Sequence, residues 1–213
     1  CIAGGIDEKD VTDKISKLFE KGHQASANQK EKVVEHQDEP GVLIHHKKTD
    51  QTHFCLGVRA YDLSDERKYA LALLAIILGG NMSSRLFIKV RERNGLAYSI
   101  HTSAETLTDS GFLVTQAGID HKNLERAAQL IVEEYRDLRD NVVSEKELQK
   151  AKDYLKGITS LSLDSSDVQA SFYGMQELLE KEMLSPEEKF AKIDAVSVND
   201  IKNIAEDIFK SQK

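Results

Sequence analysis

The segment YALALLAIIL, residues 69–78, constrains the fold more than any other part of the chain. Its apolar side chains are nearly continuous, so a helix built from it has almost no polar face to present to water. The run is also well short of the roughly 20 residues that a membrane-spanning helix requires. We therefore predict a helix that is buried on most of its surface. Ser64 can cap its start, and Gly79 and Gly80 end it.

The segments around this helix indicate the rest of the fold. Residues 42–46 and 53–61 are predicted strands, and so are residues 96–101 and 111–119. Beyond residue 120 the apolar spacing is almost entirely helical, with capping residues before several of the predicted helices. Because strands and helices are partly segregated along the chain, we predict an α+β fold, in which helices cover one face of an antiparallel sheet.

The first 40 residues predict a separate organisation. Residues 1–22 combine an apolar strand end, two glycines and an amphipathic helix, which is typical of the interior of an α/β unit. We expect this chain to begin within a larger fold. Residues 23–40 are polar, lack sustained periodicity and end at Pro40, so they are predicted to be a linker. Residues 41–213 then form one domain.

Composition excludes some classes of function. The 213 residues carry a formal net charge of −7, which argues against nucleic acid as the main partner. The two cysteines, Cys1 and Cys55, have no spacing that suggests a zinc knuckle or a disulfide framework. Cys55 lies in the apolar run HFCLGV, so we expect it to be a small buried hydrophobic residue.

Motifs for metal and nucleophilic chemistry are missing. None of the seven histidines lies four residues from another, so a two-histidine zinc face on a helix is not encoded. His45 and His46 are neighbours in a predicted strand and should point to opposite faces. The chain has no Gly-x-Ser-x-Gly elbow, and GGNMSS lacks the ending of a phosphate loop. We predict no metal site and no cofactor-binding site within this chain.

The stretch GGNMSSRLFIKVRERNGLAYS, residues 79–99, carries the remaining candidates, Arg91 and Tyr98. Gly95 lies between them and can end a helix in a left-handed conformation. Alternation in the following strand predicts Tyr98 on the same face as Ile100. One interpretation leaves Arg91 in solvent and Tyr98 in the core with its hydroxyl outward, and spacing alone favours it. The other brings two hydrogen-bond donors to one substrate carbonyl, as a peptide hydrolase requires.

A family resemblance changes this balance. The stretch LAIILGGNMSSRLFIKVRERNGLAYSI closely resembles the signature of the non-zinc-binding half of the pitrilysin/insulinase-type metallopeptidases, which include mitochondrial processing peptidase. The likeness covers about residues 40–209, including SEKELQKAKDYLKGITSLSLDSS and SPEEKFAKIDAVSVNDIKNIAEDIF. Residues 1–22 resemble the last strand and helix of the preceding, zinc-binding half. Asn81 stands where the family pattern has a third glycine. Asparagine tolerates the left-handed backbone conformation that glycine adopts, so we expect the turn to be kept.

The resemblance implies a role for the chain as a processing peptidase-like half-domain. In this family two homologous halves close around an unfolded peptide. The first binds zinc through His-x-x-Glu-His, and the second contributes an arginine and a tyrosine that match Arg91 and Tyr98. The zinc motif is absent here, so zinc is expected in the missing N-terminal half, and this chain alone is expected to be inactive.

The resemblance also names the partners and a rival function. The implied partners are a peptide substrate and either the N-terminal half or a partner subunit, with a dimer as one arrangement. No membrane span is expected. Two explanations of the missing zinc motif stay open: truncation of a complete peptidase, or zinc on a partner subunit. The rival interpretations are a non-catalytic assembly subunit of the same fold, like the core proteins of respiratory complexes, and a peptide-binding scaffold without chemistry.

Overall fold

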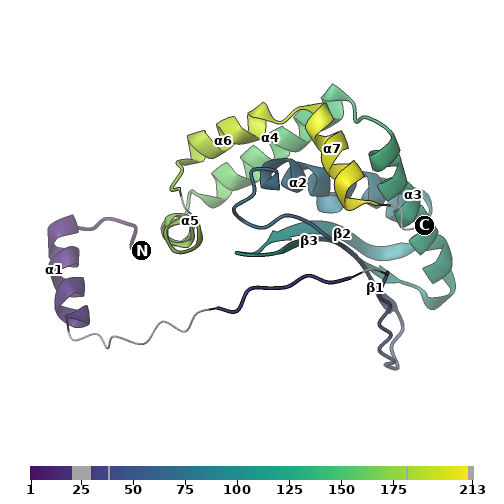
Figure 1. The fold of residues 1–213 in the computed structure, drawn as a ribbon, viewed down its shortest axis with the longest axis horizontal. Helices are drawn as coiled ribbons and strands as arrows, with labels where there is room; N and C mark the ends of the chain where they lie inside the picture. The colour runs from purple at the N-terminus through teal and green to yellow at the C-terminus, as the bar shows by residue number, and fades with distance from the viewer. Residues whose placement is uncertain (21–29, 38, 181, 211–213) are drawn as a thin grey trace.

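The computed structural model describes residues 1–20, 30–37, 39–180 and 182–210 (Figure 1). Its elements follow the order expected for an α+β chain, with π-helical turns at η1 and η2 and a 3-10 turn at η3. They are α1 (Glu8–Phe19), β1 (Thr52–Arg59), α2 (Lys68–Ala75), η1 (Ile76–Gly80), η2 (Phe87–Arg93), β2 (Ala97–Thr106), β3 (Gly111–Ile119), η3 (His121–Asn123), α3 (Leu124–Asp140), α4 (Glu145–Ser162), α5 (Ser166–Leu179), α6 (Pro186–Ala195) and α7 (Val198–Ile208). No helix in these described ranges is long and apolar enough to cross a lipid bilayer.

The sheet has three antiparallel strands in the order β1-β3-β2. Figure 1 shows the helices of the domain stacked on one side of this sheet. Side chains along β1 alternate strictly between half-buried and exposed positions, as they do in a strand with one face on the core and one face open. The predicted fold class, an antiparallel sheet covered on one face by helices, is confirmed.

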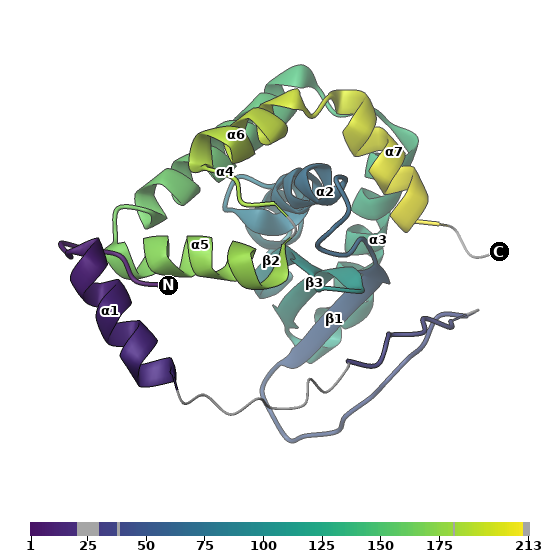
Figure 2. The same cartoon turned by 60° about the vertical axis from the view of Figure 1, so that its left-hand side comes forward.

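Helix α2 and the turn η1 form the centre of the core. Leu71, Leu73, Leu74 and Leu78 are completely inaccessible to solvent. In Figure 2 helices α3 to α7 lie around α2, and α4, α6 and α7 contact it directly. The prediction of a buried helix over residues 69–78 is therefore confirmed, although the last part of the run winds as a π-helical turn.

A close approach between η1 and β2 fixes how this helix lies on the sheet. A Cβ placed on Gly79 would come within 2.2 Å of Thr102 Oγ1, so only glycine allows the two backbones to meet here. Thr102 is itself buried, and its hydroxyl is 2.7 Å from that of Thr115, which is 2.7 Å from the hydroxyl of Tyr135. These three side chains satisfy one another's hydrogen bonds within the core.

The chain leaves η2 through a turn centred on Gly95. This glycine has φ of +60°, which confirms the predicted left-handed residue. Its N–H donates to Arg91 O at 3.0 Å, and the N–H of Leu96 donates to Val90 O at 3.0 Å. Together these bonds satisfy carbonyl groups at the end of the helix and direct the chain into β2.

Two predicted strands do not form. Residues 41–50 have no regular structure, and the side chain of Leu43 is 97% exposed. Residues 1–4 are likewise irregular, whereas α1 forms with its apolar stripe exposed. A strand is stable only when its backbone groups pair with a neighbour, and none of the three described strands pairs with either segment. Residues 30–37 and 39–40 of the predicted linker lack helices and strands, and the remainder of it, including His23, lies outside the described residues.

The expectation for Cys55 is wrong. Its side chain is exposed because the alternation of β1 places it on the open face of the sheet, between the exposed positions His53 and Gly57. A short apolar run does not by itself reveal that one face of its strand is uncovered.

Gly79→Ala should destabilise the domain. The added methyl group meets Thr102 at both its side chain and its backbone nitrogen, so we expect the free energy of unfolding to fall by about 1–3 kcal/mol. The matched control is Gly157→Ala in α4, where no atom lies within 4 Å of the added Cβ. There the change should be neutral or stabilising by up to about 1 kcal/mol. Urea unfolding of both variants measures the difference, and equal stability would contradict the close packing.

Gly95→Ala tests the turn without any steric contact. No atom lies within 4 Å of a Cβ at this position, so the left-handed φ is the sole source of strain. We expect a loss of about 1–2 kcal/mol on urea unfolding, and a smaller loss for Gly95→Asn because asparagine tolerates this conformation. A loss in Gly95→Asn as large as that in Gly95→Ala would rule out backbone strain as the cause.

Candidate functional site

Arg91 lies on the exposed side of η2. The buried residues Leu86 and Val90 hold the opposite side of this segment against the core. The guanidinium of Arg91 lies over the ring of Phe87, with its Cζ 4.7 Å from the ring centroid. Its donors have no carboxylate or carbonyl partner among the interactions of the described residues, so they are available to an external acceptor.

Tyr98 is presented by an irregularity in β2. Ala97 pairs with Ile119 and Ser99 pairs with Gly118, so Tyr98 is the extra residue of a β-bulge. Two successive side chains, Tyr98 and Ser99, are exposed as a result, and Tyr98 is 76% exposed. The alternation expected from the sequence, with Tyr98 on the face of Ile100, is therefore wrong. Ile100 is buried, and the bulge turns Tyr98 away from it.

Arg91 and Tyr98 thus stand on either side of the Gly95 turn, and neither is enclosed in the hydrophobic core. The structure forms no hydrogen bond between these two described side chains. What the local fold provides is a guanidinium from the end of a π-helical turn and a phenol from the beginning of a strand. Both irregular features are enriched next to functional sites in proteins.

The open face of the sheet extends from Tyr98 as a polar surface. Pairing across the three strands places His53, Gly118 and Ser99 in one row and Cys55, Gln116 and His101 in the next. Apart from Gly118, these residues are exposed. The sequence interpretation did not identify this surface. The amide of Gln116 within the mostly apolar strand 111–119 is the signal that could have indicated an uncovered face.

A cluster of charges joins the segment that carries Arg91 to the helices behind it. Arg85 donates from Nε and Nη2 to both carboxylate oxygens of Glu147 at 2.7 and 2.8 Å, and from Nη1 to Asp137 at 2.6 Å. Lys89 donates to Glu134 at 2.9 Å and to Glu133 at 3.2 Å. The hydrogen bonds to Glu147 raise the pKa of Arg85, and the bond to Glu134 raises that of Lys89.

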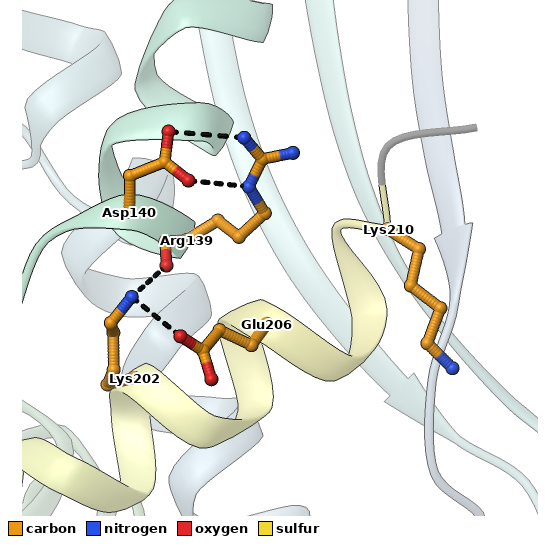
Figure 3. A pocket seen from close by; sticks show the side chains of 5 residues that line it. All are labelled: Arg139, Asp140, Lys202, Glu206 and Lys210. Carbon is orange, nitrogen blue, oxygen red and sulfur yellow. Dashed lines mark hydrogen bonds and ion pairs between the residues drawn. The ribbon is translucent and has the colours of Figure 1, made fainter. Parts of the chain in front are cut away.

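A shallow hollow of about 640 Å³ lies elsewhere, between the C-terminal end of α3 and helix α7 (Figure 3). Its charged groups already have partners: Arg139 pairs with Asp140, and Lys202 reaches Arg139 O and Glu206. In Figure 3 Lys210 points away from the other four lining residues, and it pairs with Asp207. These contacts connect two helices and leave no unpaired charge for a ligand, so we interpret the hollow as structural.

Metal-binding groups do not cluster in the described ranges. No three His, Cys, Asp or Glu side chains in them lie close enough together to hold a metal ion. His45 and His46 lie in the irregular, exposed segment 41–50. The residues that the structure describes therefore do not fit a catalytic zinc ion, which needs three protein ligands.

Comparison with known proteins identifies the family. Residues 1–155 match the family described as the peptidase M16 inactive domain. The chain is 33% identical over 209 residues to the "uncharacterized zinc protease YmxG" of Bacillus subtilis, covering 98% of this chain and 50% of that protein. An "uncharacterized zinc protease" of Streptomyces coelicolor is 32% identical over 162 residues, covering 76% of this chain and 35% of that protein. The chain thus spans about half the length of these relatives, or less.

Solved structures have the same fold. A conserved protein from Enterococcus faecalis V583 superimposes with a TM-score of 0.77 at 27% identity, over 96% of this chain and 48% of that one. A protease from Helicobacter pylori gives a TM-score of 0.79 at 20% identity, over 98% of this chain and 51% of that one. The matched family, the zinc protease relatives and the shared fold lead to one conclusion: this chain belongs to the peptidase M16 family and corresponds to its C-terminal, inactive domain.

Proposed function

We propose that this chain is the substrate-clamping half of a zinc metalloendopeptidase that acts on unfolded peptides. Zinc is bound by a companion half, either upstream in the same polypeptide or on a partner subunit. Arg91 and Tyr98 reach the substrate from this side, and the chain alone is inactive. The relatives named as zinc proteases, which are about twice the length of this chain or more, support this assignment.

The β-bulge at Tyr98 is the observation that carries the proposal. A bulge disrupts the hydrogen-bond ladder of a sheet, and here it moves a large aromatic ring out of contact with the core. A tyrosine that served only to stabilise the fold would gain more from regular alternation, which would bury the ring beside Ile100. The position is therefore better explained by a contact outside this domain.

The chemistry of the two side chains suits a peptide carbonyl. Hydrolysis of a peptide bond develops negative charge on the carbonyl oxygen, and a phenol donor placed nearby stabilises that charge. Tyr98 is assigned this role. The guanidinium of Arg91 donates to backbone carbonyl oxygens of the bound peptide, which holds the peptide in place.

Surfaces without a partner support the existence of a companion half. Leu43 and its apolar neighbours Val42 and Ile44 are exposed in an unpaired segment. Helix α1 exposes Leu18 and Phe19 on its apolar stripe. Apolar surface of this kind is typical of an interface that another chain or domain covers. The open polar face of the sheet beside Tyr98 is then free to line the space between the two halves.

A non-catalytic assembly subunit is the second candidate. A chain of Complex III2 from Candida albicans has the same fold, with a TM-score of 0.68 at 23% identity, so the fold alone does not separate the two functions. The free donors of Arg91 and Tyr98 favour the peptidase, because assembly requires neither of them. A His-x-x-Glu-His motif upstream in the same gene, or in a partner subunit, would separate the candidates. Its absence from both would favour assembly.

Tyr98→Phe should lower the turnover of the complete enzyme. Loss of one donor to the developing oxyanion is expected to reduce kcat by about ten- to a thousandfold, with zinc content unchanged. Peptide cleavage and metal analysis measure the two quantities. Tyr154→Phe, on the exposed part of α4, is the matched control and should retain wild-type turnover. Wild-type turnover in Tyr98→Phe as well would remove Tyr98 from the mechanism.

Zinc and activity should depend on the companion half. We expect this chain alone to bind no stoichiometric zinc and to cleave no peptide, because its described residues lack a ligand cluster. The protein with both halves should contain one zinc per pair of halves, and a chelator should abolish its cleavage of an unfolded peptide. Cleavage by the complete protein without zinc would refute the assigned reaction class.

A further inference from the structure

We propose that Arg85 is a positioning residue for Arg91 and Tyr98. It fixes the rotation of the segment from residue 85 to the bulge in β2, so that both side chains meet the substrate in a defined geometry. This inference rests on the proposed function, since it assigns Arg85 an effect on a site formed by those two residues. Arg85 itself touches neither the substrate nor the reacting atoms.

The first step of the argument is the geometry of the guanidinium. Arg85 is mostly buried, with 21% of its side chain exposed, and it bridges two helices. It binds Glu147 in α4 through two donors and Asp137 in α3 through a third. A planar fork held by two carboxylates at once allows little rotation about its own bonds. The buried neighbours Leu86 and Val90 fix how deep the segment lies, but apolar contacts are not directional.

The second step is the charge balance around this segment. Arg85 and Lys89 are one helical turn apart and face four carboxylates, those of Glu133, Glu134, Asp137 and Glu147. Acidic groups outnumber basic groups two to one in these contacts. Removing Arg85 leaves like charges adjacent in a partly buried place, where repulsion is weakly screened. The carboxylates of α3 and α4 would then repel one another, and Lys89 would remain as the charged contact of the segment with α3.

The third step connects the cluster to the functional side chains. Carbonyl groups of the tethered segment hold the turn that follows it. Lys89 O accepts from the side-chain amide of Asn94 at 2.6 Å, and Arg91 O and Val90 O accept from the N–H groups of Gly95 and Leu96. Rotation of the segment about its axis would therefore move Arg91 directly. It would also move the start of β2, where Tyr98 bulges out.

The experiment compares two partly buried cations in the complete enzyme with both halves present. Arg85→Met removes the proposed positioning residue. Lys68→Met is the matched control: Lys68 is 17% exposed, and its Nζ donates to Glu180 at 2.7 Å and to Leu63 O at 2.8 Å, both outside residues 85–98. Urea unfolding places both variants on one stability scale. Arg85→Lys keeps the charge but loses the two-donor geometry, so it should fall between Arg85→Met and wild type.

Two measurements separate positioning from stability. Hydrogen–deuterium exchange over peptides that cover residues 91–98 should be about tenfold faster in Arg85→Met and unchanged in Lys68→Met at matched stability. In Arg85→Met, kcat should fall by about ten- to a hundredfold while KM stays within about twofold, since misplaced groups lose transition-state contacts first. Lys68→Met should keep wild-type kcat.

Each outcome decides a different claim. Equal exchange and equal kcat in Arg85→Met and Lys68→Met would overturn the positioning role and leave Arg85 as a stabilising residue. If Arg85→Met fails to fold, Arg85→Lys and Glu147→Gln give the same comparison, because the first removes donors and the second an acceptor of the two-donor contact between residues 85 and 147. Wild-type turnover in Tyr98→Phe would refute the proposed function, whereas the exchange measurement would still decide whether Arg85 fixes the segment.

Discussion

The close contact between Gly79 and Thr102 sets the position of the central helix on the sheet. It brings the backbone of the central helix directly onto the sheet, and the apolar run that precedes it is buried as a consequence. The close approach also determines where the chain leaves the core. From that point the turn at Asn81, the tethered segment at Arg85 and the bend at Gly95 follow in sequence before β2 begins.

The candidate site lies where regular structure is interrupted. A π-helical turn ends at Arg93, a left-handed glycine follows, and a bulge opens the next strand. Each irregularity loses a hydrogen bond or strains the backbone, which destabilises the fold locally. The packing of the surrounding domain is strong enough to maintain these conformations. Charged groups behind the segment restrict its motion, so that exposed side chains are held by a rigid support. The side chains of Arg91 and Tyr98 are therefore two solvent-exposed donors on a rigid part of the domain.

Most of the fold could be predicted from patterns that a single element carries. The apolar run 69–78 indicated a buried helix because its own composition leaves no polar face. Strands at 53–61 and 111–119 followed from local propensity and are present with small shifts in their ends. Residues 42–46 have equal propensity and form no strand, because pairing depends on a neighbour that those residues do not specify.

For the candidate site, the residues that carry donors and the glycine that separates them, Gly95, could be identified from the sequence. The sequence also determined the family signature and the left-handed turn, because glycine alone adopts that φ without strain. The outward direction of Tyr98 follows from folding alone, because the bulge arises from pairing with β3 and is not visible in the residue alternation of the strand itself. The ties of Arg85 to Asp137 and Glu147 likewise join residues 52 and 62 positions apart, a separation that only folding brings into contact.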